Sequence, residues 1–291
     1  MTGIVYLSLI VIVHIALTFC NNKVKAGLSA SHNSSDSNYL LNWADEFNQD
    51  GSPDTSVWHF ENGLIRNEEH QWYQRNNAWC ENGKLIIEAR RERVVNPDFV
   101  ANSPDWKKNR EYSEYTSANI QTRGSNTWQY GRFEMRARID TSMGLWPAWW
   151  TLGITGEWPS CGEIDIMEYY RGNLLANVAH GSDTRFKAKW HTVIKPLDSL
   201  GKNKWSENFH TWRMDWDEKK IQLFVDDVLL NEVLLTELVN EDNSNFNPFM
   251  QKHFMLLNLA VGGANGGDPT FTSFPKRFEI DYVRVYQKKK N

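Results

Sequence analysis

Short runs in which apolar and polar residues alternate recur along the chain from about residue 39 onwards. A period of two is typical of strands that bury one face, and the turn-forming clusters between the runs favour antiparallel pairing. The pattern therefore predicts an all-β sandwich, with a single short helical turn at Leu234–Val239. The predicted strands are Lys84–Ala89, Ser117–Gln121, Gly131–Ile139, Glu163–Met167, Ile221–Val225, His253–Leu259 and Phe278–Tyr286.

Three loop-rich stretches interrupt the strand pattern. They are predicted at Asn96–Tyr112, Phe186–Asn208 and Val261–Phe274. Long loops on a rigid sandwich are where binding residues gather, so these stretches are expected to border a functional site.

The beginning of the chain has a different composition. The segment Ile4–Phe19 is almost entirely apolar, yet it is shorter than the roughly 20 residues that a bilayer span needs. It predicts an export leader over residues 1–26, processed either before Cys20, which would then carry a lipid anchor, or after Ala26. We therefore expect an exported protein that is secreted, periplasmic or anchored by lipid at the cell surface.

Residues 27–38 are small and polar and predict a flexible linker. One folded domain is expected over 39–287, followed by a basic tail at 288–291, and it is expected to act as a monomer. The net charge is −4, from 32 basic and 36 acidic residues whose signs are mixed along the chain. A nucleic-acid partner is disfavoured, because such proteins normally carry a basic stripe.

Two cysteines, Cys80 and Cys161, remain if Cys20 is removed or lipidated. In an exported protein they could form one disulfide, but two buried free thiols are an equal alternative. No CxxC pair is present, so a zinc site built from cysteines is excluded.

The most informative segment contains three acids, Glu163, Asp165 and Glu168. Because side chains alternate along a strand, Glu163 and Asp165 share one face. Strict alternation would turn Glu168 into the core, and one extra residue in the strand would return it to the acidic face. Met167 is the candidate for this β-bulge, which would align the three carboxylates.

Three neighbouring carboxylates repel one another, so one proton should be held above its usual pKa while another group stays ionised. A pair in these two states is what glycoside hydrolysis requires. Glu163 and Glu168 lie roughly 13 Å apart at Cα by the strand rise, so their side chains must lean together to act on one bond. The alternative to a catalytic role is that the three acids form a solvated strand face and pair with basic residues on adjacent strands.

Tryptophan is as common as phenylalanine, with 14 of each. Indole rings stack on the apolar faces of sugars, although most tryptophans of a sandwich fill its core. Trp146 and Trp150 precede the acids closely and are the best candidates for sugar contacts.

The acidic segment Gly162–Glu168 (GEIDIME) is similar to the ExDxxE signature of glycoside hydrolase family 16 in its β-bulge, laminarinase-like form. Three further segments resemble the family in the same order: residues 130–134 (YGRFE), 144–153 (GLWPAWWTLG) and 281–286 (DYVRVY). The resemblance extends from about Trp43 to Gln287.

The resemblance implies a curved β-jelly-roll of two antiparallel sheets with the active-site cleft on its concave face. It also implies an endo-acting, retaining hydrolase of β-linked polysaccharides that needs no cofactor for the reaction. By position, Glu163 resembles the nucleophile, Asp165 the residue that holds and tunes it, and Glu168 the acid/base.

Other functional residues are carried over in the same way. Asn67, Arg90, Trp146, Trp150 and His180 resemble family residues, whereas Trp190 lies in a stretch that departs from the family pattern and is expected on the cleft rim. Many family members bind a structural Ca²⁺, and the matching positions here are Glu46, Gly83 and Asp281. The expected substrate-binding residues are Asn67, Arg90, Trp146, Trp150, His180 and Trp190.

Two stretches depart from the simple laminarinase pattern, the polar insertion Asn96–Arg110 and the Lys- and Trp-containing Phe186–Asn208. Their basic and aromatic residues could contact a decorated or anionic glycan, or could be solvated surface. The GLWPAWW segment favours β-1,3- or mixed-linkage β-1,3(4)-glucan. The alternatives are a galactan-type backbone, a transglycosylase, and a lectin-like module without activity, which the complete acid set argues against.

Overall fold

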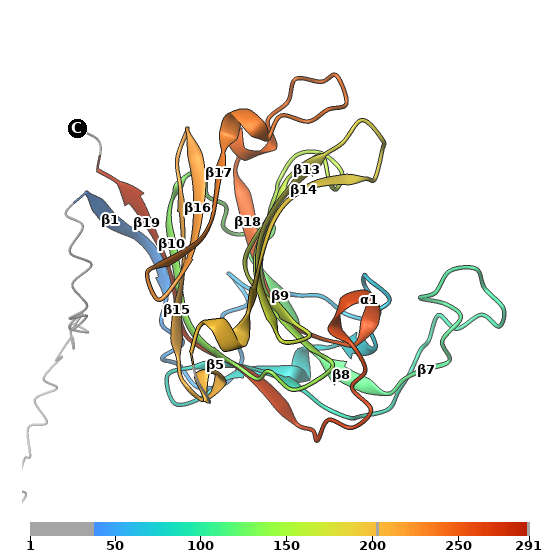
Figure 1. Cartoon of the computed structure of the whole chain (residues 1–291). Helices are drawn as coiled ribbons and strands as arrows, with labels where there is room; N and C mark the ends of the chain where they lie inside the picture. Colours follow the sequence, from blue (N-terminus) through green and yellow to red (C-terminus); the bar gives the residue numbers. More distant parts are fainter. Residues whose placement is uncertain (1–37, 202–203, 290–291) are drawn as a thin grey trace, which may run out of the picture. The chain divides into compact units, whose positions relative to one another are not determined.

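Two antiparallel sheets lie face to face in the computed structural model, which describes residues 38–201 and 204–289 (Figure 1). The predicted leader, with Cys20, lies outside the described residues. Within these residues no helix is long and apolar enough to cross a membrane.

The larger sheet has eight strands. In spatial order it contains β17 (Val228–Leu234), β16 (Lys220–Val225), β15 (His210–Trp216), β10 (Gly131–Ile139), β19 (Lys276–Lys288), β5 (Leu85–Ala89) and β4 (Ala78–Cys80), and β1 (Tyr39–Asp45) also pairs with β19.

The smaller sheet has seven strands. Its spatial order is β14 (Ala188–Pro196), β13 (Asn173–Gly181), β12 (Glu163–Tyr170), β11 (Leu145–Gly153), β18 (His253–Val261), β9 (Asn119–Gln121) and β2 (His59–Phe60).

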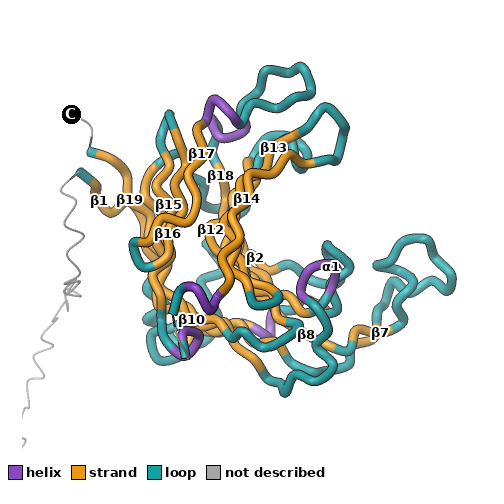
Figure 2. Tube along the Cα trace, in the orientation of Figure 1, coloured by secondary structure: helices purple, strands orange, loops and turns teal. Residues whose placement is uncertain are grey.

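Short elements connect the sheets. β3 (Gln71–Tyr73) pairs in parallel with β8 (Tyr115–Ser117), and β6 (Val94–Val95) pairs with β7 (Tyr112–Ser113). Figure 2 shows the strands as one block with long loops at its periphery, including the loop that leads to β7. The helical turns are η1 (Arg75–Asn77), η2 (Leu197–Ser199), η3 (Trp205–Glu207), η4 (Leu235–Glu237), η5 (Pro248–Met250) and α1 (Gly263–Gly266).

The core lies between the two sheets, because each contributes one apolar face. Along β10, buried and half-buried residues alternate without a break, and Phe133 and Met135 point into the core. The tryptophan excess is largely a core feature, since large indoles fill the space between the sheets. Four tryptophans are fully buried there: Trp58, Trp149, Trp212 and Trp216.

The predicted all-β class is confirmed, and every predicted strand is present. The range Gly131–Ile139 is reproduced as β10, and the turn expected at Leu234–Val239 contains η4. The predicted loop at Phe186–Asn208 is wrong in part, because Ala188–Pro196 forms β14. This strand is at the sheet edge and leaves both faces partly exposed, so its sequence lacks the apolar face that would have revealed it. Cys80 and Cys161 are free and buried, which decides between the two alternatives.

Candidate active site

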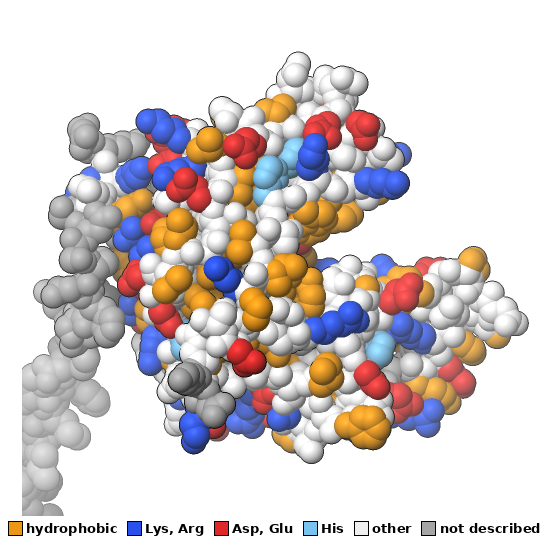
Figure 3. Space-filling view, in the orientation of Figure 1, with side chains coloured by type: hydrophobic (Ala, Val, Ile, Leu, Met, Phe, Trp, Pro, Cys, Tyr) orange, Lys and Arg blue, Asp and Glu red, His pale blue; other side chains and the backbone are white. Residues whose placement is uncertain are grey.

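A cleft of about 700 Å³ lies on the open face of the smaller sheet, opposite the face that meets the core. Strands β11, β12, β13, β14 and β18 all contribute side chains to it. The space-filling view shows a deep notch in the surface at this place (Figure 3). Its volume is typical of ligand-binding sites, and its lining combines aromatic side chains with amide and carboxylate groups.

A β-bulge in β12 brings all three predicted acids to this cleft. Trp149 and Trp150 of β11 pair with Met167 and Asp165, so Ile166 is the extra residue against that strand, whereas the sequence analysis placed it at Met167. Ile166 and Met167 are both fully buried in the core. Two consecutive inward residues return the next carboxylate to the cleft, as the sequence predicted.

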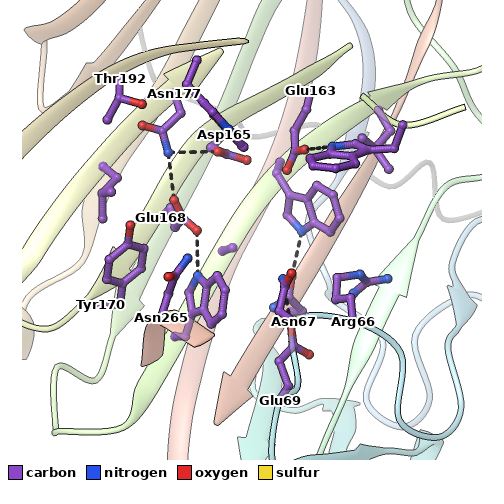
Figure 4. A pocket seen from close by; sticks show the side chains of 18 of the residues that line it. Arg66, Asn67, Glu69, Glu163, Asp165, Glu168, Tyr170, Asn177, Thr192 and Asn265 are labelled. Atoms are coloured by element: carbon purple, nitrogen blue, oxygen red, sulfur yellow. Dashed lines mark hydrogen bonds between the residues drawn. The ribbon is translucent and has the colours of Figure 1, made fainter. Parts of the chain in front are cut away.

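Asn177 links two of the acids (Figure 4). Its Nδ2 group donates to Asp165 Oδ2 at 3.0 Å and to Glu168 Oε2 at 2.9 Å. The indole Nε1 of Trp146 donates to the other oxygen of Glu168 at 2.7 Å. Both oxygens of Glu168 therefore have a fixed donor, which sets the direction in which its carboxyl group faces the cleft.

Glu163 is held by different partners. The indole of Trp158 donates a hydrogen bond to its carboxylate, and Asp165 is a second hydrogen-bonding neighbour. Arg66 also faces Glu163, and its positive charge favours the ionised carboxylate.

The three acids titrate differently because their neighbours differ. Burial raises the pKa of each. Burial, followed by the charges of Glu163 and Glu168, raises the pKa of Asp165 well above its usual range. Burial raises the pKa of Glu168 to about 7, against the hydrogen bond from Trp146. The pKa of Glu168 lies near neutral pH, so this group can both give and accept a proton there.

The loop that carries Asn67 borders one end of the cleft. Asn67 and Glu68 both adopt positive φ angles of 56° and 51°. Gly263 allows the close packing beneath them, since a Cβ atom there would lie 2.7 Å from the carbonyl oxygen of Asn67. Glu69, which also lines the cleft, is buried and accepts a hydrogen bond from Gln71 at 2.7 Å. The loop is therefore held rigidly against the sheet.

Trp150 forms part of the cleft floor. Its Nε1 donates to Asn258 Oδ1 at 2.7 Å, and the guanidinium of Arg66 lies 5.2 Å from its ring centroid. Arg66 is itself paired with Glu61. This layered arrangement fixes the plane of the indole ring, which is the property that sugar stacking requires.

Four of the predicted substrate-binding residues, Asn67, Trp146, Trp150 and Trp190, line the cleft together with the three acids. Arg90 does not. It follows β5 of the larger sheet, pairs with Glu88 at 2.6 Å and lies over the ring of Trp79. Its position on the other sheet excludes it from this cleft.

His180 also lies away from the cleft. It is three positions beyond Asn177 on β13, and an odd separation places it on the opposite face of the sheet. Its ring is buried and stacks on His191 with centroids 5.6 Å apart. Burial lowers the pKa of His180, as expected for an uncharged interior residue.

The predicted calcium ligands lie near the pairing of β1 with β19. Glu46 is paired with Arg284, with Nε–Oε1 at 2.7 Å, and Asp281 is paired with Arg136. Among the described residues there is no cluster of three or more His, Cys, Asp and Glu side chains that could hold a metal. Both carboxylates therefore have arginine partners, and the calcium site at Glu46, Gly83 and Asp281 stays a prediction.

The sequence analysis missed several cleft residues. Asn177 had one usable signal, since a polar amide in an otherwise apolar strand normally serves a specific partner. Trp158 lies only five residues before Glu163 in the sequence, but it was not predicted as a site residue. Arg66 and Thr192 gave no local signal, because only the sheet order brings them to the cleft.

Comparison with known proteins identifies the family. Residues 66–284 match the model of glycosyl hydrolases family 16. The chain belongs to glycoside hydrolase family 16. The predicted membership, jelly-roll sandwich and glycoside hydrolase activity are thereby confirmed, and family 16 hydrolases need no cofactor for catalysis.

Relatives within family 16 cover nearly the whole described chain. A β-glucanase of Rhodothermus marinus is 37% identical over 263 residues, which is 85% of each chain. A glucan endo-1,3-β-glucosidase of Cryptopygus antarcticus is 36% identical over 277 residues, covering 85% of this chain and 92% of its own. A structure from work on endo-acting O-glycanases, with which human gut bacteria initiate mucin breakdown, has a TM-score of 0.79 at 32% identity, covering 87% of this chain and 92% of that chain.

Proposed function

We propose that the protein is an endo-acting, retaining hydrolase of β-1,3- or mixed-linkage β-1,3(4)-glucan. The observation that carries the proposal is the row of three buried acids in one aromatic cleft, with the pKa of Glu168 raised to about 7. Relatives named as a β-glucanase and a glucan endo-1,3-β-glucosidase support the glucan backbone.

In the proposed reaction, Glu168 donates its proton to the leaving oxygen while Glu163 attacks the anomeric carbon. Asp165 stays protonated and donates its hydrogen bond to Glu163, which keeps the nucleophile oriented and ionised. Glu168, now a carboxylate, removes a proton from water, and the resulting hydroxide releases the sugar from Glu163 with net retention.

Two basic side chains near the cleft already have acidic partners. On the β13–β14 hairpin and strand β14, Arg185 is paired with Glu157 at 2.7 Å and Lys189 with Glu241. These basic side chains already have acidic partners, so a sulfate or carboxylate on the substrate would have to compete for them.

A second candidate is the same chemistry on another β-linked backbone, such as a galactan-type chain or an O-glycan. The TM-score of 0.79 with the structure from the O-glycanase work favours it.

The deciding experiment incubates the purified chain with laminarin, barley mixed-linkage glucan, agarose, porphyran, carrageenan, keratan-type glycan and mucin O-glycans. Oligosaccharide products of retained anomeric configuration from a glucan are expected. Cleavage of only a galactan or an O-glycan would contradict the glucan assignment. Binding without any cleavage would favour the lectin-like alternative.

Glu163→Gln should abolish turnover of the cleaved glycan, by about 10⁴-fold or more, while binding of oligosaccharides persists because the cleft is unchanged. Binding measured by calorimetry and turnover measured by reducing ends separate the two effects. Near-normal turnover would remove the nucleophile assignment.

We further propose that the enzyme works outside the cytoplasm, on the basis of the apolar segment Ile4–Phe19. Cell fractionation of the natural host with an antibody against the folded domain tests this, and a purely cytoplasmic signal would contradict it.

A further inference from the structure

The insertion 96–110 forms an ordered arm between β6 and β7 that projects from the sandwich beside α1 (Figure 1). The side chain of Asn96 is buried at its base and donates to the carbonyl oxygens of Lys107 at 2.7 Å and Arg110 at 2.8 Å. One buried amide thus ties the two ends of the insertion together and gives the arm a fixed shape.

Arg110 couples the arm to the wall of the cleft. Its guanidinium donates to the carbonyl oxygen of Glu69 at 2.6 Å and to that of Glu68 at 2.8 Å. Glu69 and its neighbour Asn67 line the cleft. The arm is therefore attached directly to the loop that ends the cleft, and in Figure 3 it prolongs the lower side of the notch.

Trp106 is the largest aromatic residue of the arm. Its ring centroid lies 4.9 Å from the guanidinium of Arg110, and the side chain is half-buried. It belongs to neither of the two hydrophobic clusters found among the described residues. The guanidinium of Arg110, which also donates to the Glu68 and Glu69 carbonyl oxygens, holds the indole in place. The Nζ of Lys107 lies 5.9 Å from the ring centroid and is a further donor beside the indole. An apolar ring outside the core with a donor beside it matches the C–H face and hydroxyl rim of a sugar ring.

We propose that the arm, through Trp106 and Arg110, is an additional sugar-binding site that continues the cleft beyond Asn67 and contacts distal sugar units of a long glycan chain. This inference rests on the proposed endo-hydrolase function. It assigns the insertion a role in binding the polymer, and no part in bond cleavage.

The test compares Trp106→Ala with the wild-type chain on two substrates of the same linkage, the polysaccharide and the shortest oligosaccharide that the enzyme cleaves. We expect kcat/KM on the polysaccharide to fall about three- to tenfold, mainly through KM. The value on the short oligosaccharide should stay within twofold, because that substrate does not reach the arm.

Trp79→Ala is the matched control. Trp79 is also a half-buried indole with arginines at its ring, Arg90 at 5.7 Å and Arg277 at 5.5 Å, but it lies on β4 of the larger sheet. It should change neither substrate's kcat/KM. Circular dichroism and thermal unfolding of both variants establish that each is folded.

A loss of equal size on both substrates, or none on the polysaccharide, would overturn the inference while leaving the hydrolase function intact. A wild-type chain that cleaves no glycan would overturn the proposed function and this inference with it.

Discussion

At the scale of single residues, Glu168 and Asn177 together predict the pH dependence of the enzyme. Glu168 must carry a proton to act as the acid, so activity should fall as the pH rises through its pKa of about 7. The hydrogen bond from Asn177 favours the ionised form of Glu168 and therefore lowers that pKa.

Asn177→Leu should move the basic limb of the kcat/KM profile upward by about one pH unit, because the lost bond is one to a charged group. It should also lower kcat at the optimum, since Glu168 loses one of its two fixed donors. A pH–rate profile on the preferred glycan measures both effects.

Asn258→Leu is the control for this variant. Asn258 is a buried cleft amide bonded to Trp150 and to no catalytic acid. Replacing Asn258 should leave the basic limb of the kcat/KM profile at the wild-type pH. If the basic limb of Asn177→Leu also stays at the wild-type pH, the positioning role of Asn177 is contradicted.

The sequence predicted that the three acids face one cleft, but it did not predict which residues hydrogen-bond to them. Glu163, Asp165 and Glu168 lie on one strand, where period-two alternation and one bulge decide their direction. Asn177 and Trp158 reach these acids from other elements, and local spacing does not encode which residues of separate strands will meet.

At the scale of secondary-structure elements, the glycine turn after β18 determines where the Asn67 loop lies. Gly263 has a φ of +71°, and a Cβ on it would lie 2.7 Å from the Asn67 carbonyl oxygen. Gly263→Ala should displace the loop, raise KM severalfold and destabilise the fold by about 1–3 kcal/mol. Steady-state kinetics and chemical denaturation measure these effects.

Gly172→Ala is the control that shows the effect of backbone strain alone, without a clash like that between a Cβ on residue 263 and the Asn67 carbonyl oxygen. Gly172 has a similar φ of +78° in the turn between β12 and β13, but a Cβ there would meet no atom within 4 Å. It should lose about 1 kcal/mol of stability without a change in KM. Equal KM effects in the two variants would contradict the packing explanation.

Strands with one apolar face were predictable, whereas β14 was not. Its alternate residues Trp190, Thr192 and Ile194 face the cleft, so its two largest apolar side chains lie where substrate is proposed to bind. Sequence prediction recognises a strand by polar residues on its exposed face. A strand whose exposed face carries apolar residues for ligand binding does not show this pattern.

At the scale of the whole molecule, the buried acids make stability depend on pH. The pKa of Glu168 is about 7 in the folded chain and 4.5 in an unfolded one, so the folded state binds more protons between these values. Stability should therefore fall as the pH rises from about 4.5 to 7. Glu168→Gln removes the part of this dependence that Glu168 contributes. The stability of the variant relative to wild type should therefore be up to about 3 kcal/mol higher at pH 8 than at pH 4.5.

Thermal unfolding of both proteins across this pH range measures the difference. Parallel curves would show that Glu168 has the same pKa in the folded and unfolded states, which would contradict its burial as the cause of the shift.

The position of β19 determines when the molecule can fold during its synthesis. Among the described strands this one comes latest in the chain, yet it pairs with β10 on one side and with β5 and β1 on the other. Until residues 276–288 emerge, three earlier strands lack the neighbour that satisfies their backbone groups. Compaction of the larger sheet must therefore wait until residues 276–288 have been synthesised, and a chain truncated before residue 276 would expose open strand edges to aggregation and proteolysis.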